Sequence, residues 1–199
     1  MSKPWKKQLL KLTTTKETIF PVPFTPRKIR DNIIINTNKI SYASKVEIIK
    51  KAFNLHSQGN ISAAVQYYQY FIDQGFKDHK MFSNYGIILR TLGKLKEAEL
   101  YTRQAIQLKP DFAEAYSNLG IILISLGNLN EAELNTRKAI KIKPDYADAY
   151  LNLGTILNNL GKPKEAEEST RKAIEIKPND AIAYSNLGGI LLDLGNISE

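Results

Sequence analysis

The sequence predicts an all-α fold, a solenoid in which copies of one helical hairpin stack in a row. Three observations support this prediction. Residues 111–144 and 145–178 are identical at 22 of 34 aligned positions, the same period runs from Lys77 to the end of the chain, and each copy holds two helical patterns separated by a short turn that contains Gly. A hairpin of this size cannot bury its apolar face alone, so each copy must pack against the next.

The copy at residues 111–144 shows how the hairpin is encoded. Apolar and small residues fall at spacings of three and four in two runs, which predicts two helices. The first run is Ala113, Tyr116, Leu119, Gly120 and Leu123, and the second is Leu129, Ala132, Thr136, Ala139 and Ile140. Gly127 predicts a left-handed cap on the first helix, Asn128 predicts a cap on the second, and Pro144 ends the second helix. Gly120 and Ala132 are small where the two backbones must approach closely.

The same residue types recur when each copy is numbered from His79, Ala113, Ala147 or Ala181 as position 1. The recurring residues are Phe82, Tyr85, Gly86, Ala98 and Pro110, then Tyr116, Leu119, Gly120, Ala132 and Pro144, then Tyr150, Leu153, Gly154, Ala166 and Pro178. This spacing resembles the tetratricopeptide repeat. Two departures are Tyr or Phe in place of Trp at position 4, and Thr in place of an aromatic residue at position 24. The resemblance implies a right-handed superhelix whose first helices line a concave ligand groove.

The chain divides into a leader, residues 1–44, and a repeat array, residues 45–199. The leader is Pro-containing and basic, and we expect it to be largely irregular. The array comprises a divergent repeat at 45–76, full repeats at 77–110, 111–144 and 145–178, and a truncated repeat at 179–199. Ser44 and Glu47 form a capping box that predicts a helix from Lys45.

Two parts of the array leave alternatives open. The aromatic residues Tyr67, Tyr68, Tyr70 and Phe71 of the divergent repeat are either core residues or a ligand platform. In the truncated repeat, Tyr184, Leu187 and Leu191 lie on a predicted helix without a hairpin partner. We therefore expect either a longer reading frame or a partner that completes the stack.

Composition narrows the classes of function. The net charge is +8, of which +7 belongs to residues 1–44 and +1 to residues 45–199. The leader is either a solvated tail or a polybasic contact for nucleic acid or anionic lipid, whereas the nearly neutral array argues against nucleic acid as its partner. Cys is absent, so disulfides and Cys-based metal sites are excluded. No apolar run approaches a membrane span, and we expect a cytoplasmic location. Oligomeric state is left undetermined.

No catalytic, cofactor or metal motif is present in the sequence. His56 and His79 are interpreted as packing or surface residues. The Glu residues at positions 19 and 21 of each copy are predicted to face solvent and to pair with Arg or Lys in neighbouring turns. We therefore expect no cofactor and no enzymatic activity from these residues.

The candidate site is a row of Asn residues at position 6 of four successive copies. The row comprises Asn84, Asn118, Asn152 and Asn186, and Arg90 and Thr155 complete the predicted peptide-binding set. An amide offers both a donor and an acceptor to a peptide backbone. The row resembles the asparagine ladder in the repeat domain of O-linked N-acetylglucosamine transferases. A structural role in bonding neighbouring units is the alternative, because partly buried polar groups must be paired.

The predicted function is a protein-interaction scaffold that binds an extended peptide or a protein partner in the groove. Lys80 and Arg90 are opposed there by Glu114, Asp148 and Asp193, so we expect a neutral or mixed ligand. The basic clamp that co-chaperone repeats use for a terminal carboxylate is not present. The alternative function is substrate recruitment for a glycosyl- or sulfotransferase whose catalytic domain lies beyond residue 199.

Overall fold

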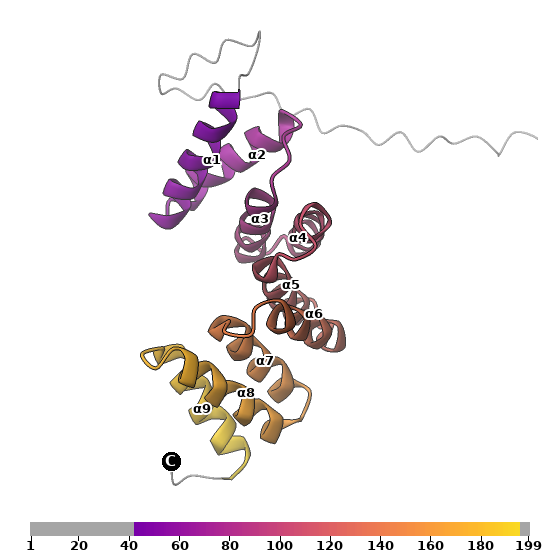
Figure 1. Ribbon diagram of the computed structural model, residues 1–199, viewed down its shortest axis with the longest axis vertical. Helices are drawn as coiled ribbons and strands as arrows, with labels where there is room; N and C mark the ends of the chain where they lie inside the picture. The colour runs from indigo at the N-terminus through magenta and orange to yellow at the C-terminus, as the bar shows by residue number, and fades with distance from the viewer. Residues whose placement is uncertain (1–41, 196–199) are drawn as a thin grey trace, which may run out of the picture. The chain divides into compact units, whose positions relative to one another are not determined.

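Residues 42–195 are described by the computed structural model, and every element in this range is an α-helix. Figure 1 shows the helices following one another along the chain. They are α1 (Tyr42–Ser57), α2 (Ile61–Asp73), α3 (His79–Thr91), α4 (Leu95–Leu108), α5 (Ala113–Ser125), α6 (Leu129–Ile142), α7 (Ala147–Asn159), α8 (Pro163–Ile176) and α9 (Ala181–Asp193). Within the described range, the prediction of an all-α fold is confirmed.

Each hairpin turns at a Gly in the left-handed conformation. Gly127 joins α5 to α6 with φ of 79°, a conformation that costs Gly little because it has no Cβ. The Gly127 N–H donates to Ile124 O at 3.0 Å, and the Asn128 N–H donates to Leu123 O at 2.9 Å. These two bonds satisfy the last carbonyl groups of α5 and turn the chain back toward it. The predicted left-handed cap is confirmed.

The two helices of a hairpin approach closely where a Gly faces a Thr. A Cβ on Gly120 would collide with the Thr136 hydroxyl and would also meet Ala132 O at 3.5 Å. The same collision would occur between Gly86 and Thr102. Thr at position 24 therefore fills the space that Gly at position 8 leaves, which explains why an aromatic residue is not needed there.

Successive hairpins pack through the first helix of the later copy, which contacts both helices of the copy before it. Each second helix contacts the first helix that follows it, as α4 contacts α5 and α6 contacts α7. In addition, α3 contacts α5, α5 contacts α7 and α7 contacts α9. Leu119 and Leu123 of α5 join Ala132 of α6 and Ile156 of α7 in one apolar cluster. Burial thus continues from one repeat to the next, as in a solenoid.

The divergent first repeat is joined to the second by aromatic packing. Tyr68 and Phe71 of α2 are fully buried, and the Tyr68 ring stacks on Tyr85 of α3 with 5.4 Å between centroids. Tyr85 in turn packs against Tyr101 of α4 at 5.1 Å. Of the two interpretations offered for these aromatic residues, the structure places Tyr68 and Phe71 in the core.

Two local predictions were wrong. Helix α1 begins at Tyr42, so Ser44 lies inside its first turn and does not cap a helix that begins at Lys45. Asn128 occupies the cap position of α6 but makes no side-chain capping bond, in contrast to Asn60, which accepts from the Ala63 N–H at 3.3 Å. The turn at Asn128 therefore forms without a side-chain capping bond. Apart from residues 42–44, the predicted leader lies outside the described residues.

The last described helix, α9, packs on one side only. Leu187 and Leu191 are buried, whereas Ile182, Tyr184 and Leu192 are 64%, 52% and 65% exposed. A Cβ on Gly188 would meet no atom within 4 Å. The face that a hairpin partner covers in the other repeats is therefore open in α9, which agrees with the expected exposure of Tyr184 but not of Leu187 or Leu191.

Candidate functional site

The four Asn residues of the predicted row lie on α3, α5, α7 and α9, and each is partly buried. Asn118 Nδ2 donates to Ser83 Oγ at 2.9 Å, and Asn152 Nδ2 donates to Ser117 Oγ at 3.0 Å. Both Ser residues are buried. Each amide nitrogen therefore bonds the first helix of the preceding repeat, a contact between residues 35 apart in sequence.

Asn186 bonds a residue at a different repeat position, because the preceding copy lacks a hydroxyl at position 5. Leu151 occupies that position, and Asn186 Nδ2 instead donates to Thr155 Oγ1 at 3.2 Å. Thr155, predicted as a ligand contact, also donates to Leu151 O at 3.2 Å. The structure brings Asn186 and Thr155 together as partners of each other.

Asn84 at the start of the row also reaches the preceding repeat. Burial raises the pKa of the Tyr68 phenol, and a hydrogen bond with the Asn84 side chain opposes that rise. Tyr68 lies on α2, which ends the repeat before that of Asn84. All four Asn side chains thus contribute to packing between repeats.

The amide oxygens of the row are differently placed. Within residues 42–195, no hydrogen bond is donated to Oδ1 of Asn118, Asn152 or Asn186. An amide oxygen accepts up to two hydrogen bonds. In these three residues the amide nitrogen is therefore held by the protein and the amide oxygen is left without a donor from residues 42–195.

Arg90, the remaining predicted contact, lies at position 12 of α3. It is partly buried, and its Nε has no hydrogen-bond partner within the described residues. Sequence reasoning did not identify the Ser residues at position 5 as partners of the row. The signal that could have identified them is the presence of a hydroxyl at Ser83 and Ser117 opposite an Asn in the next copy.

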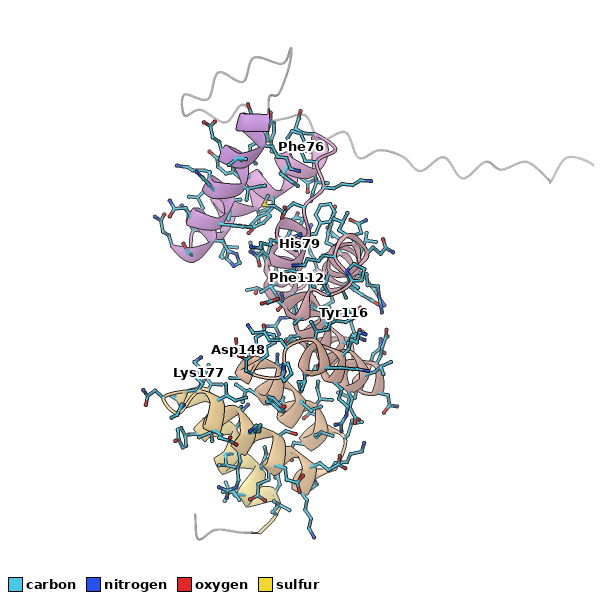
Figure 2. All side chains as sticks on the ribbon, viewed as in Figure 1. Phe76, His79, Phe112, Tyr116, Asp148 and Lys177 are labelled. Carbon is cyan, nitrogen blue, oxygen red and sulfur yellow. The ribbon has the colours of Figure 1, made fainter. Side chains whose placement is uncertain are left out.

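Two acidic residues near the row form ion pairs with Lys residues that follow the second helices. Glu114 Oε1 lies 3.8 Å from Lys143 Nζ, and Asp148 Oδ1 lies 3.8 Å from Lys177 Nζ. Figure 2 labels Asp148 and Lys177, and their ion pair joins the start of α7 to the loop before α9. Asp193 Oδ2 accepts from Asn158 Nδ2 at 2.8 Å. Glu114 and Asp148 therefore each lie near a Lys side chain, whereas Asp193 is held by a neutral amide.

The Glu residues at positions 19 and 21 make a ladder of ion pairs along the second helices. Arg103 Nη2 contacts Glu99 Oε1 at 2.9 Å on its own helix and Glu131 Oε1 at 2.7 Å on the next repeat. Arg137 repeats this arrangement with Glu133 at 2.9 Å and Glu165 at 3.4 Å. The predicted pairing of these Glu residues is confirmed, and Arg103 and Arg137 each join two successive repeats. The prediction that they face solvent is wrong at position 21, where the Glu99 and Glu133 side chains are 18% and 17% exposed.

The two His residues both pack against aromatic rings. His79 contacts Phe112 edge to face with 4.7 Å between centroids, and Figure 2 shows this pair where α3 and α5 begin. His56 Nδ1 lies 3.4 Å from the Tyr68 hydroxyl, and burial lowers the pKa of His56. Across residues 42–195 no three His, Asp or Glu side chains are close enough to hold a metal ion.

The described helices include none that is long and apolar enough to cross a membrane. Taken together, helical hairpins that repeat every 34 residues and pack through their first helices define a helical-repeat protein, the class in which a row of equivalent side chains forms an extended surface. The tetratricopeptide repeat profile matches residues 79–112, 113–146 and 147–180. These matches cover more than half of the chain, and the chain belongs to the tetratricopeptide repeat family.

Solved structures agree with this assignment. A thermophilic tetratricopeptide repeat protein of Thermus thermophilus superposes with a TM-score of 0.69 at 20% identity, covering 76% of this chain and 84% of that one. YrrB, described as a TPR protein with an unusual peptide-binding site, gives 0.61 at 23% identity and covers 72% and 74%. The first TPR domain of Spaghetti, solved with an HSP90 peptide, gives 0.56 at 22% identity and covers 59% and 93%. At these identities the likeness shows the fold alone.

No curated protein sequence gives a significant match to the chain.

Proposed function

We propose that this chain is a noncatalytic interaction protein whose first-helix surface, the exposed side of α3, α5, α7 and α9 around the Asn row, binds an extended peptide. The peptide backbone lies along the row, and its N–H groups donate to the Asn amide oxygens. The role of the chain is then to hold a partner protein through such a segment.

The observation that carries the proposal is that the nitrogen and the oxygen of each Asn amide have different surroundings. The nitrogen of Asn118 or Asn152 donates to a Ser of the preceding helix at 2.9 or 3.0 Å, while the oxygen receives no hydrogen bond from residues 42–195. A side chain fixed at one end and open at the other is a preorganised acceptor, because no rotamer freedom is lost when a ligand binds. Acceptors that recur once in every repeat suit a ligand with a recurring donor, and a peptide backbone supplies one N–H for each residue.

The side chains beside the row favour an uncharged or mixed peptide. Ile87 and Ile121 at position 9 are partly buried and apolar, and Thr155 takes the same position in the next copy. Glu114 and Asp148, beside the middle of the row, each lie 3.8 Å from a Lys Nζ, so both signs of charge are present there. Specificity would then come from peptide side chains that contact Ile87 and Ile121, at positions between those whose backbone N–H groups bond the Asn row.

The comparisons lend support by analogy. YrrB is described as having a peptide-binding site, and Spaghetti was solved with a bound peptide. The resemblance of the row to the asparagine ladder of O-linked N-acetylglucosamine transferases points to the same kind of contact. Because a fold does not fix a ligand, the proposal depends on the row itself.

The test uses a peptide selected from a random library against the full chain. Each of its amide groups is N-methylated in turn, which removes one donor, and affinity is measured by fluorescence anisotropy. Positions facing the row should lose about fivefold in affinity, the equivalent of about 1 kcal/mol for one hydrogen bond, and the intervening positions should change little. Asn118→Ala with Asn152→Ala should weaken the parent peptide and remove the dependence on methylation at the two facing sites.

Asn135→Ala is the matched control. Asn135 lies on α6, where its Nδ2 donates to Glu131 O at 2.8 Å, so the same atoms are deleted away from the row. This control should bind like the unchanged chain. If methylation has the same effect at every peptide position, or if the double Asn variant binds the peptide unchanged while remaining folded, the row is not the binding surface.

A further inference from the structure

A second candidate binding site lies on the other side of the repeats, between α6 and α8. Successive first helices contact one another, but α6 and α8 make no comparable contact, and α7 lies behind the space between them. The result is an open cleft of about 450 Å³, which we call the outer cleft. It is lined by Arg137, Ile140, Lys141, Tyr150, Leu153, Glu168, Ser169 and Lys172.

The floor of the outer cleft is apolar. Ile140 of α6 and Leu153 of α7 belong to one apolar cluster, and Leu153 is 3% exposed. Tyr150 of α7 is partly buried, and its hydroxyl makes no hydrogen bond within residues 42–195. An apolar floor with a phenol hydroxyl favours a ligand that has an apolar body and a polar group.

The rim of the outer cleft carries three cationic side chains and one carboxylate, that of Glu168. Two of the cations have partners: Arg137 contacts Glu133 at 2.9 Å and Glu165 at 3.4 Å, and Lys172 contacts Glu175 at 2.8 Å. Lys141 is exposed and has no ion-pair partner in the described part of the chain. Lys141 is therefore the cation that is available to an incoming anion.

The charge pattern is particular to this junction. At the equivalent positions one repeat earlier, Gln107 replaces Lys141 and Leu134 replaces Glu168. Leu134 is 70% exposed and Leu100, one repeat before it, is 53% exposed. A partner lying along the second helices would thus contact exposed Leu side chains on α4 and α6, and the cationic cleft between α6 and α8.

We infer that the outer cleft binds an acidic side chain that follows an apolar residue in a partner protein, independently of the Asn row. The apolar side chain packs on Ile140, Leu153 and Tyr150, and the carboxylate pairs with Lys141. A single carboxylate matches one available cation. A nucleic acid would need a longer run of cations, and Glu165 and Glu168 on α8 would repel its phosphates.

The test measures binding of two small probes to the full chain by NMR chemical-shift perturbation. The probes are the dipeptides N-acetyl-Phe-Glu-amide and N-acetyl-Phe-Gln-amide, which differ only in charge at the second residue. The acidic probe should shift the Tyr150 and Leu153 resonances and should bind at least fivefold more tightly than the neutral one. Lys141→Glu should abolish this preference, and Glu168→Gln should tighten binding of the acidic probe two- to threefold.

Lys164→Glu is the matched control, because Lys164 is exposed on α8 and does not line the cleft. It should leave both affinities unchanged, as should the double Asn118→Ala and Asn152→Ala variant. Equal binding of the two probes, unchanged preference in Lys141→Glu, or no shift at Tyr150 and Leu153 at probe concentrations on the order of 10 mM would overturn the inference. Binding of a single-stranded oligonucleotide that Lys141→Glu abolishes would also overturn it.

Discussion

Two Gly residues only seven positions apart are required for different reasons. Gly120 lies within α5, where any Cβ would collide with the Thr136 hydroxyl on α6. Gly127 lies in the turn, where a Cβ would meet no atom within 4 Å but φ is 79°. The first Gly is required by packing and the second by backbone conformation.

Gly120→Ala should destabilise the protein by about 1–3 kcal/mol, because the added methyl group must displace Thr136 in a fully packed contact. Gly188 occupies the same repeat position in α9, where a Cβ would meet nothing within 4 Å. Gly188→Ala should therefore be neutral or stabilising by up to about 1 kcal/mol, as helix propensity predicts. Urea unfolding followed by circular dichroism measures both changes, and equal destabilisation by the two variants would contradict the packing explanation.

At the scale of the helical hairpin, the turn between α5 and α6 is set by backbone hydrogen bonds and not by a side-chain cap. Gly127 and Asn128 donate to carbonyl groups of α5 at 3.0 and 2.9 Å, while the Asn128 side chain makes no capping bond. The cost of changing this turn should therefore follow the φ preference of the residue at position 127.

Gly127→Ala should destabilise the protein by about 1–2 kcal/mol, because an Ala in the left-handed region places its Cβ against the following carbonyl. Gly127→Asn should cost less, since Asn tolerates this region better than Ala. Thermal and urea unfolding of the two variants provide the comparison. If Ala and Asn have the same effect, φ does not determine the energy of the turn.

Sequence periodicity was sufficient to predict the hairpins, the close approach at Gly120, the cap at Gly127 and the end of α6 before Pro144, because these features depend on residues within one 34-residue copy. It placed the Asn residues on one helix face for the same reason. It did not predict that Asn118 bonds Ser83, because that contact depends on the rotation between repeats. The early start of α1 at Tyr42 was also missed, because the Ser44 and Glu47 pattern was taken as the cap although Ser41, another residue type common at helix starts, comes before it in the sequence.

At the scale of the whole array, stability should vary along the chain, because each repeat contacts only its neighbours. Leu119, Ile122 and Leu123 of α5 are fully buried between repeats. By contrast, among the described side chains of α1 one residue, Ala52, is buried. In α9, Ile182 is 64% exposed. Packing therefore decreases toward both ends of the described range.

Native-state hydrogen exchange should show this gradient. Amides in α5 and α6 should exchange at least tenfold more slowly than those in α1 and α9, because the terminal helices open without disrupting the central repeats. Mass spectrometry of peptides from each helix measures the rates. Uniform protection from α1 to α9 would indicate a single cooperative unit instead of coupled repeats.

The bond from Asn118 to Ser83 is repeated, one unit later, by the bond from Asn152 to Ser117. Excision of residues 113–146 would therefore bring Asn152 opposite Ser83, and the joint between the remaining copies would keep the same pair of side chains. Unequal recombination within such a gene adds or removes whole repeats and keeps the same Asn-to-Ser contact between neighbouring copies, so the number of repeats changes without a new contact having to evolve.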